Sequence, residues 1–251
     1  MITAAASGIG REVARAFMEA GARVEICDVD ENAVAAFEKD YPEIVCTKAD
    51  VTVEADVRAF FNTALERLGG LDVLVNNAGV SGPTAPVNEI ALADWQRTLA
   101  VNLDSTFLCT QQAVPVMQKQ GSGLIVNMAS TAGLFGYPRR APYAAAKWAI
   151  IGLTKTLAME LGPSGIRVNA ICPGSVDGER IERVIQAEAD ATGKTAAAVR
   201  REWEGQVSMR TFVTARDVAE VILFLASKAG ARISGQSLAV DGHTEGLGMT
   251  E

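Results

Sequence analysis

The stretch that decides the fold class is Thr3-Ala4-Ala5-Ala6-Ser7-Gly8-Ile9-Gly10, which joins a short apolar run to a helical pattern. Its two glycines indicate a tight turn between a strand and a helix, where the backbone can approach a pyrophosphate. The unpaired N–H groups and the dipole of a helix N-terminus favour such an anion. The residues expected to contact it are Ser7, Gly8, Ile9 and Gly10.

An acidic residue follows this turn at an informative distance. Asp28 ends the next predicted strand, twenty residues beyond Gly8, and a carboxylate at that spacing can accept hydrogen bonds from an adenosine ribose. It would repel a 2′-phosphate, and no arginine or lysine occupies positions 27–30 to neutralise one. We therefore predict that NAD binds here rather than NADP. The alternative is that Asp28 is only a solvated strand end.

The hydrophobic pattern of the chain predicts further strands and helices after this turn. Apolar runs bounded by turn signals alternate with helical patterns, which favours βαβ units and a parallel sheet. Strands are predicted at Arg23–Asp28, Ile44–Lys48, Leu71–Asn76, Gly123–Met128, Arg167–Cys172 and Ser237–Val240. Helices are predicted at Gly10–Ala20, Val53–Leu68, Ala91–Gln118, Pro142–Leu161 and Ala215–Ser227. We predict one α/β domain over residues 1–251: a Rossmann-type, doubly wound parallel sheet of about seven strands with helices on both faces.

The first strand departs from the usual lengths. Only Met1-Ile2 precedes the turn as an apolar run, whereas strands are typically about five or six residues long. Either the central strand is unusually short, or the sequence as given lacks a few native residues before it.

Composition limits the functional classes. Of the 251 residues 49% are hydrophobic and 21% are charged, which allows a large core and excludes wholesale disorder. The net charge of −7 argues against a nucleic-acid partner. No apolar run reaches membrane-spanning length and no signal peptide is visible, so we predict no membrane partner. Reduced thiols and a cytoplasmic location are predicted, because no C-x-x-C spacing relates Cys27, Cys46, Cys109 and Cys172.

Two familiar kinds of active site are disfavoured. His243 is the single histidine, so a multi-histidine zinc site cannot form, and we predict no metal. No serine lies in G-x-S-x-G, as a Ser-His-Asp hydrolase of that type would require. We expect His243 at a surface or an interface rather than in catalysis.

Tyr143-Ala-Ala-Ala-Lys147, with Ser130 thirteen residues upstream, is the strongest catalytic signal. Positions i and i+4 share one face of a helix, so the phenol and the ammonium can address one small volume. A phenol ordinarily has a pKa near 10, and a neighbouring ammonium lowers it towards the range of a general base. Ser130 could then hydrogen-bond a substrate oxygen or the tyrosine.

These features together resemble the short-chain dehydrogenase/reductase family, in its compact single-domain form, over nearly the whole chain. Thr3 to Gly10 matches the family's T-G-x-x-x-G-x-G, except that Ala4 stands where the first glycine is expected. Since alanine tolerates positive φ poorly, we expect a slightly different path or a negative φ at Ala4. The family's C-terminal signatures are matched by Phe224-Leu225-Ala226-Ser227 and Asp241-Gly242.

The resemblance assigns further cofactor contacts. Asp50-Val51 matches the pair that flanks the adenine, and Asn76-Asn77-Ala78-Gly79 matches the N-N-A-G that walls the pocket. Pro173-Gly174 matches the turn beside the nicotinamide. The family often has threonine where Gly178 stands, so the backbone of Val176 is expected to serve the carboxamide instead. The implied cofactor-binding residues are Ser7, Gly8, Ile9, Gly10, Asp28, Asp50, Val51, Asn77, Ala78, Gly79, Tyr143, Lys147, Pro173, Gly174 and Val176.

The resemblance also implies the reaction, which is hydride transfer between NAD(H) and a secondary alcohol or ketone. Tyr143 would exchange the hydroxyl proton, while Lys147 stabilises the phenolate and holds the nicotinamide ribose. Ser130 would orient the substrate oxygen. Asn102 matches the helix asparagine that holds a water in the proton relay, although it could simply cap or kink its helix. The implied catalytic residues are therefore Asn102, Ser130, Tyr143 and Lys147.

Substrate choice is expected to depend on two variable segments. One is Leu134–Ala141, and the other is a helical insertion over the cleft at Ser175–Arg210, which would act as a lid. Aromatic residues mixed with arginines suit a polar or anionic hydroxy compound, such as a sugar derivative or a hydroxy acid. The alternative is that these arginines face solvent, because the insertion is also rich in glutamate.

Two alternative functions are possible, and the resemblance also implies an oligomeric state. An NADPH-dependent 3-oxoacyl reductase shares the fold and the catalytic residues, but Asp28 and the acidic charge disfavour it. A catalytically silent dinucleotide-binding protein would be expected to have lost Ser130, Tyr143 or Lys147. By resemblance we expect a homotetramer in which the helices at Ala91–Gln118 and Pro142–Leu161 pair across one interface.

Overall fold

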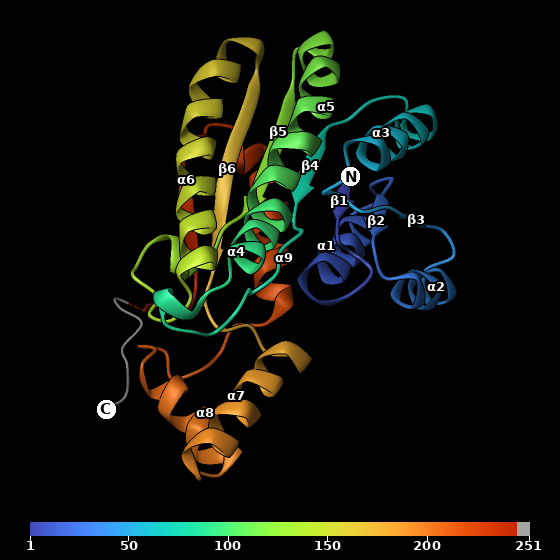
Figure 1. The fold of residues 1–251 in the computed structure, drawn as a ribbon. Coiled ribbons are helices and arrows are strands. Elements are labelled where there is room, and N and C mark those ends of the chain that lie inside the picture. Colours follow the sequence, from blue (N-terminus) through green and yellow to red (C-terminus); the bar gives the residue numbers. More distant parts are fainter. Residues whose placement is uncertain (245–251) are drawn as a thin grey trace.

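A parallel sheet forms the centre of the molecule (Figure 1). The computed structural model describes residues 1–244, apart from the side chains of Arg180, Ala187 and Ala191. Within these residues the sheet has seven strands in the order β3-β2-β1-β4-β5-β6-β7, and every neighbouring pair is parallel. The strands are β1 (Ile2–Thr3), β2 (Glu25–Asp28), β3 (Val45–Lys48), β4 (Val73–Asn76), β5 (Gly123–Met128), β6 (Ile166–Pro173) and β7 (Ser237–Val240).

Helices pack on both faces of this sheet, which confirms the predicted doubly wound α/β fold. Apolar side chains of α1 (Gly8–Glu19), α2 (Glu31–Asp40) and α9 (Ala215–Ala226) form the core on one face. Those of α3 (Glu54–Leu68), α5 (Ser105–Gln120) and α6 (Ala141–Leu161) form the core on the other. No helix within residues 1–244 is long and apolar enough to cross a membrane.

Two helical regions differ from the sequence-based expectation. The helix α2 was not predicted, although Asp30 caps it by accepting hydrogen bonds from the backbone N–H groups of Asn32 and Ala33. The single helix predicted at Ala91–Gln118 is divided into α4 (Leu92–Leu99), a π-helical turn at Ala100–Asp104, and α5. A π turn depends on a local rearrangement of i→i+5 bonds that apolar periodicity does not reveal.

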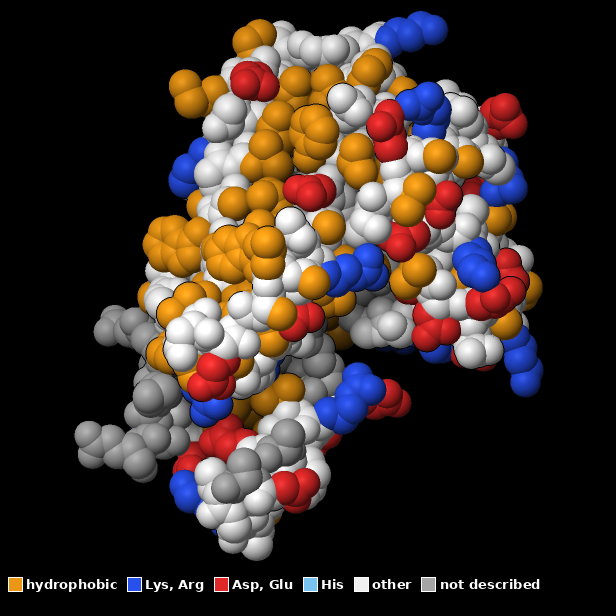
Figure 2. Space-filling view, in the orientation of Figure 1, with side chains coloured by type: hydrophobic (Ala, Val, Ile, Leu, Met, Phe, Trp, Pro, Cys, Tyr) orange, Lys and Arg blue, Asp and Glu red, His pale blue; other side chains and the backbone are white. Residues whose placement is uncertain are grey.

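The insertion after β6 folds as a helical hairpin at the end of the sheet. It consists of α7 (Glu179–Thr192) and α8 (Ala196–Gly205), which share a small core around Ile185, Val199 and Phe212. Val176 and Val213 form a parallel bridge where the chain enters and leaves it. Figure 2 shows the surface hollowed between this hairpin and the body of the domain.

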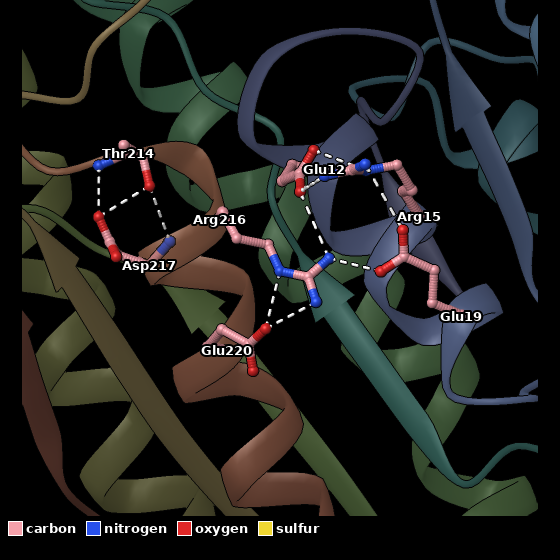
Figure 3. A network of polar contacts seen from close by, with 7 residues as sticks. All are labelled: Glu12, Arg15, Glu19, Thr214, Arg216, Asp217 and Glu220. Carbon is pink, nitrogen blue, oxygen red and sulfur yellow. Dashed lines mark hydrogen bonds and ion pairs between the residues drawn. The ribbon is translucent and has the colours of Figure 1, made fainter.

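The helices α1 and α9 are joined by a network of charges (Figure 3). The Arg216 guanidinium on α9 contacts Glu19 on α1 at 2.6 Å and Glu220 on its own helix at 2.7 Å. It also lies 3.6 Å from Glu12, which pairs in turn with Arg15. The helix that begins at the glycine-rich turn is thereby connected to the helix that follows the α7–α8 hairpin.

Candidate functional site

The predicted site residues lie at one edge of the sheet. Because all strands are parallel, their carboxyl ends meet there. The turn after β1, Asp28 at the end of β2, Asn76 at the end of β4 and Pro173 at the end of β6 all reach this edge. The strand order changes direction between β1 and β4, and ligands of open α/β sheets bind at such a point.

The backbone of the turn after β1 adopts a glycine-like conformation at an alanine. Ala4 has a φ of +49°, so the alternative of a negative φ was wrong. The physical reason lies in Asn77, whose Nδ2 donates hydrogen bonds to Thr3 O at 3.0 Å and to Ala4 O at 2.8 Å. These bonds fix the carbonyl groups on either side of the Ala4 N–Cα–C unit, and such surrounding contacts are what allow a strained conformation to persist.

The two glycines of the turn serve different purposes. Gly8 has a φ of +55°, and a Cβ added there would meet no atom within 4 Å, so the turn is open on that side. A Cβ at Gly10 would lie 2.6 Å from Asn77 Nδ2 and 2.7 Å from Ala4 O, so that position must stay small. The side chain of Ser7 makes no capping hydrogen bond to α1. The first N–H groups of α1 can therefore face an anion, and the turn fits a pyrophosphate.

Asp28 is held by the backbone on both of its oxygens. Oδ2 accepts from Ala6 N and Oδ1 from Asp30 N, each at 3.1 Å, and the residue is only 8% exposed. Each oxygen keeps a second lone pair, so the carboxylate can still accept a hydroxyl group. Asp28 is thus a fixed hydrogen-bond acceptor next to the turn after β1.

The predicted adenine-flanking pair is arranged by a local turn. Asp50 Oδ1 accepts from the N–H of Thr52 at 2.9 Å and from its hydroxyl at 2.7 Å. Burial raises the pKa of Asp50, but the bonds from Thr52 outweigh this and hold that pKa below its ordinary value. Val51 beside it is buried. The pair follows β3 and lies at the same sheet edge as Asp28.

The segment after β4 connects the turn to the opposite half of the site. The backbone N–H groups of Asn77 and Ala78 both donate to Thr3 Oγ1, at 3.0 and 3.2 Å. A Cβ at Gly79 would lie 2.8 Å from Asn102 Oδ1 and 3.4 Å from Lys147 Nζ. Gly79 therefore leaves room for these two polar groups to face one shared space.

The predicted catalytic tyrosine and lysine lie at the start of α6. The Lys147 Nζ lies 5.6 Å from the centre of the Tyr143 ring, as their i, i+4 spacing requires. Lys147 is buried, and its Nζ donates to Met128 O at the end of β5 at 2.8 Å. Pro142 lies in the first turn of α6, where its missing N–H has no cost.

Ser130 lies near the same end of α6, because the turn that follows it packs closely against the backbone of that helix. Its hydroxyl accepts from Ala132 N at 3.2 Å and caps the 3₁₀ turn Thr131–Gly133. A Cβ at Gly133 would lie 2.7 Å from Lys147 O, so this turn packs directly on α6. Ser130 and Lys147 are thereby held on neighbouring parts of the site.

Asn102 lies in the π-helical turn and keeps one polar atom without a partner. Its Nδ2 donates to Val80 O at 2.9 Å and to Thr98 O at 2.8 Å. Its Oδ1 is buried and accepts no hydrogen bond from the described residues. An unpaired buried acceptor is costly, so this atom is suited to receive a donor in the space that it shares with Lys147.

The segment after β6 forms the remaining wall. Gly174 N donates to Val240 O, and a Cβ at Gly174 would lie 2.7 Å from the Asp241 Cβ. At the Val176–Val213 bridge the bonds run from Val213 N to Ser175 O and from Asp177 N to Val213 O. The N–H of Val176 itself takes part in neither of them. Gly178 has a φ of +142°, a conformation that excludes the threonine often found there.

Two features of the site were missed in the sequence because they depend on contacts distant in the chain. Arg140 Nη1 donates to Ser81 O and Gly82 O at 3.2 Å, which joins the loop before α6 to the loop after β4. Lys48 lies opposite Asp28 in the backbone register of β3 and β2. Its side-chain Nζ contacts Glu31 Oε2 at 2.7 Å. Neither contact leaves a signal in the local sequence pattern.

The remaining titratable groups show no sign of a metal or thiol site in the described residues. No group of three or more metal-ligating side chains occurs among them. The four cysteines are buried and unbridged, and burial raises the pKa of the Cys172 thiol to about 11. His243 is exposed, and its Nδ1 lies 2.7 Å from Ser208 Oγ at the end of the α7–α8 hairpin.

Comparisons with known proteins agree with this arrangement. A family model described as enoyl-(acyl carrier protein) reductase matches residues 3–244. The chain is 37% identical to D-beta-hydroxybutyrate dehydrogenase of Rhizobium meliloti, covering 96% of each chain. The solved structure of NAD+-bound xylitol dehydrogenase has a TM-score of 0.91 at 31% identity, covering 96% of each chain. Actinorhodin polyketide ketoreductase, solved with NADPH, has a TM-score of 0.92 at 33% identity, covering 96% of this chain and 95% of that one.

Proposed function

The chain belongs to the short-chain dehydrogenase/reductase family, and we propose that it transfers hydride between NAD(H) and a secondary alcohol or the corresponding ketone. The observation that carries this proposal is the shared space beside Gly79, which Asn102 Oδ1 and Lys147 Nζ both face. Gly79 follows Asn77, which bonds to the turn after β1, and Lys147 lies beside the Tyr143 ring. An oxidoreductase that binds a nicotinamide dinucleotide is what the family membership itself establishes.

Each catalytic side chain then has a defined task. In the direction of oxidation, Tyr143 accepts the hydroxyl proton of the substrate, and bound NAD supplies the hydride acceptor. The Lys147 ammonium stabilises the phenolate by its positive charge. Ser130 donates a hydrogen bond to the substrate oxygen as charge develops on it. Asn102 Oδ1 holds a water that passes the proton towards solvent.

NAD rather than NADP is proposed because of Asp28. This carboxylate is fixed by two backbone N–H groups, so it cannot swing away from a 2′-phosphate. It would accept hydrogen bonds from the ribose hydroxyl groups instead. The two coenzymes are distinguished directly by measuring the reaction rate with NADH and with NADPH. A strong preference for NADPH would support the 3-oxoacyl reductase alternative.

For the substrate we propose a polar or anionic hydroxy compound. Arg139 precedes α6, is exposed and has a φ of +63°, a strained conformation of the kind found at functional sites. Its carbonyl accepts from Ala85 N, which fixes its position four residues before Tyr143. Among the relatives, three are dehydrogenases named for a hydroxy acid, one of which is hydroxybutyrate. The α7–α8 hairpin would close over such a substrate as a lid.

The test is an NAD+-reduction screen over secondary alcohols, polyols and hydroxy acids. A matched pair of neutral and carboxylated versions of one alcohol is included. Equal rates for the two would contradict the anionic substrate. If NADH binds but no alcohol or ketone is turned over, the silent dinucleotide-binding alternative is favoured.

We further propose a cytoplasmic homotetramer. Figure 2 shows apolar side chains gathered over α5 and α6, where Phe107 is 52%, Trp148 51% and Met159 82% exposed. Large apolar patches of this kind often mark an interface between proteins. The four unbridged cysteines support a reducing compartment.

A further inference from the structure

Strand pairing places a lysine next to Asp28, at the end of the neighbouring strand. Lys48 and Asp28 are the last residues of neighbouring parallel strands and lie directly across from one another. Strands in a sheet are about 4.8 Å apart, so the Lys48 side chain begins one strand away from the carboxylate. A lysine side chain is long and flexible, so from this position its ammonium can reach a phosphate bound beside Asp28.

The ammonium of Lys48 forms an ion pair with an acidic side chain of α2. Its Nζ donates to Glu31 Oε2 at 2.7 Å, although the two side chains are 57% and 77% exposed. Glu31 is the first residue of α2, three positions after Asp28. The local acidic charge is completed by Asp30, the N-cap of α2, whose carboxylate faces the first turn of its own helix. Glu31 is thus the carboxylate that contacts this ammonium, while Asp28 and Asp30 add negative charge at the neighbouring strand end and helix cap.

We propose that Glu31 is a coenzyme-specificity residue: by holding Lys48 it withdraws from a 2′-phosphate the cation that lies beside Asp28. The proposal rests on the dinucleotide site of the proposed function and deepens it. Asp28 repels the phosphate directly, and Glu31 removes the charge that could compensate. NADPH binding is thus weakened by the ion pair, whereas NADH, which has only hydroxyl groups at this position, is little affected.

The experiment measures dissociation constants of NADH and NADPH by fluorescence titration, without turnover. Glu31→Gln should bind NADPH about tenfold more tightly than the wild type, since one attractive contact is gained and one repulsive charge is lost. Its affinity for NADH should change by less than about twofold. Lys48→Met introduced into Glu31→Gln should remove the gain in NADPH affinity. Added salt should weaken the gain, because both side chains are exposed.

A matched control removes the same charge elsewhere. Glu220→Gln opens an ion pair that also measures 2.7 Å, on α9, and should leave both affinities unchanged. Unchanged NADPH affinity in Glu31→Gln, or a gain that persists without Lys48, would overturn the proposal while NADH binding still supports the proposed function. A wild type that binds neither nucleotide would overturn both.

Discussion

At the scale of single residues, Ala4 shows most directly how the site stores strain. A left-handed conformation costs an L-residue roughly 1–2 kcal/mol, and Ala4 occupies it with a φ of +49°. Ala4→Gly should relieve this strain, offset in part by the greater freedom of glycine in the unfolded chain. We expect a net gain of about 0.5–1 kcal/mol in the free energy of unfolding, measured by denaturant or thermal unfolding.

The neighbouring alanine provides the control for this prediction. Ala5 is fully buried and has no positive φ, so Ala5→Gly removes a packed methyl group and adds freedom to the unfolded chain. It should lower the stability by about 1 kcal/mol or more. If both variants were destabilised equally, Ala4 would not be strained.

The role of Tyr143 is tested by removing its hydroxyl group alone. Tyr143→Phe keeps the ring beside Lys147, so NADH binding should remain within about twofold of the wild type. Turnover should fall by about 10²–10⁴, the usual contribution of a positioned general base or acid. Steady-state kinetics and a binding titration separate the two effects. Retention of more than a few per cent of the activity would remove the proton-transfer role from this residue.

At this scale, a contact could be predicted when its residues are close in the sequence, and not when they are brought together by the fold. The shared face of Tyr143 and Lys147 follows from four residues of helix. The unpaired oxygen of Asn102 and the contact of Lys48 with Glu31 could not be foreseen. The first requires a π turn in the helix, and the second requires the register of two strands separated by α2.

At the scale of elements, strands and long helices were predicted where their apolar pattern is regular. The predicted strand at Gly123–Met128 has the observed bounds of β5, because both its faces are buried and Leu124–Val126 form a continuous apolar run. The helix α2 was missed because only Val34 and Phe37 are buried along its ten residues, too few to show a helical period. The break in α4–α5 was missed because all its residues are compatible with a continuous helix.

The α1–α9 network predicts a pH-dependent contribution to stability. The hydrogen bond from Arg216 lowers the pKa of Glu19 below its ordinary value of 4.5. A carboxyl group with a lowered pKa in the folded state stabilises the fold above its ordinary pKa and loses that effect as pH falls. Arg216→Met should therefore lower Tm by a few degrees at neutral pH. The difference should shrink as pH falls below about 4.5, as followed by circular dichroism.

The control for this prediction is an isolated ion pair. Among the charged groups of residues 1–244, Arg58 contacts only Glu54, and both side chains are 59% exposed, so Arg58→Met should change Tm little at any pH. A Tm difference for Arg216→Met that stayed constant from neutral to acidic pH would show that the apolar stem of Arg216, and not its charge, stabilises the pair of helices.

At the scale of the whole molecule, the order of strands is what places the site. Alternation of strands and helices in the sequence indicates a parallel sheet, but the reversal at β1 and β4 depends on which strands pair. A doubly wound sheet was predicted from the sequence, but the order in which its strands pair was not. The packing of the α7–α8 hairpin against the body, including the Val176–Val213 bridge, is likewise a property of the assembled fold.

The exposed apolar face of α5 and α6 gives the last prediction. The wild type should elute with four times the 26.4 kDa mass of the chain in size exclusion with light scattering. Trp148→Glu adds a charge to an interface that would bury it without a partner, which is strongly unfavourable, so the variant should elute as a smaller species. Val87, 73% exposed in the 3₁₀ turn Val87–Glu89, lies outside both helices, and Val87→Glu should keep the wild-type mass. If the wild type were already monomeric, or if Trp148→Glu kept the full mass, these helices would not form the interface, and the apolar face would need another partner.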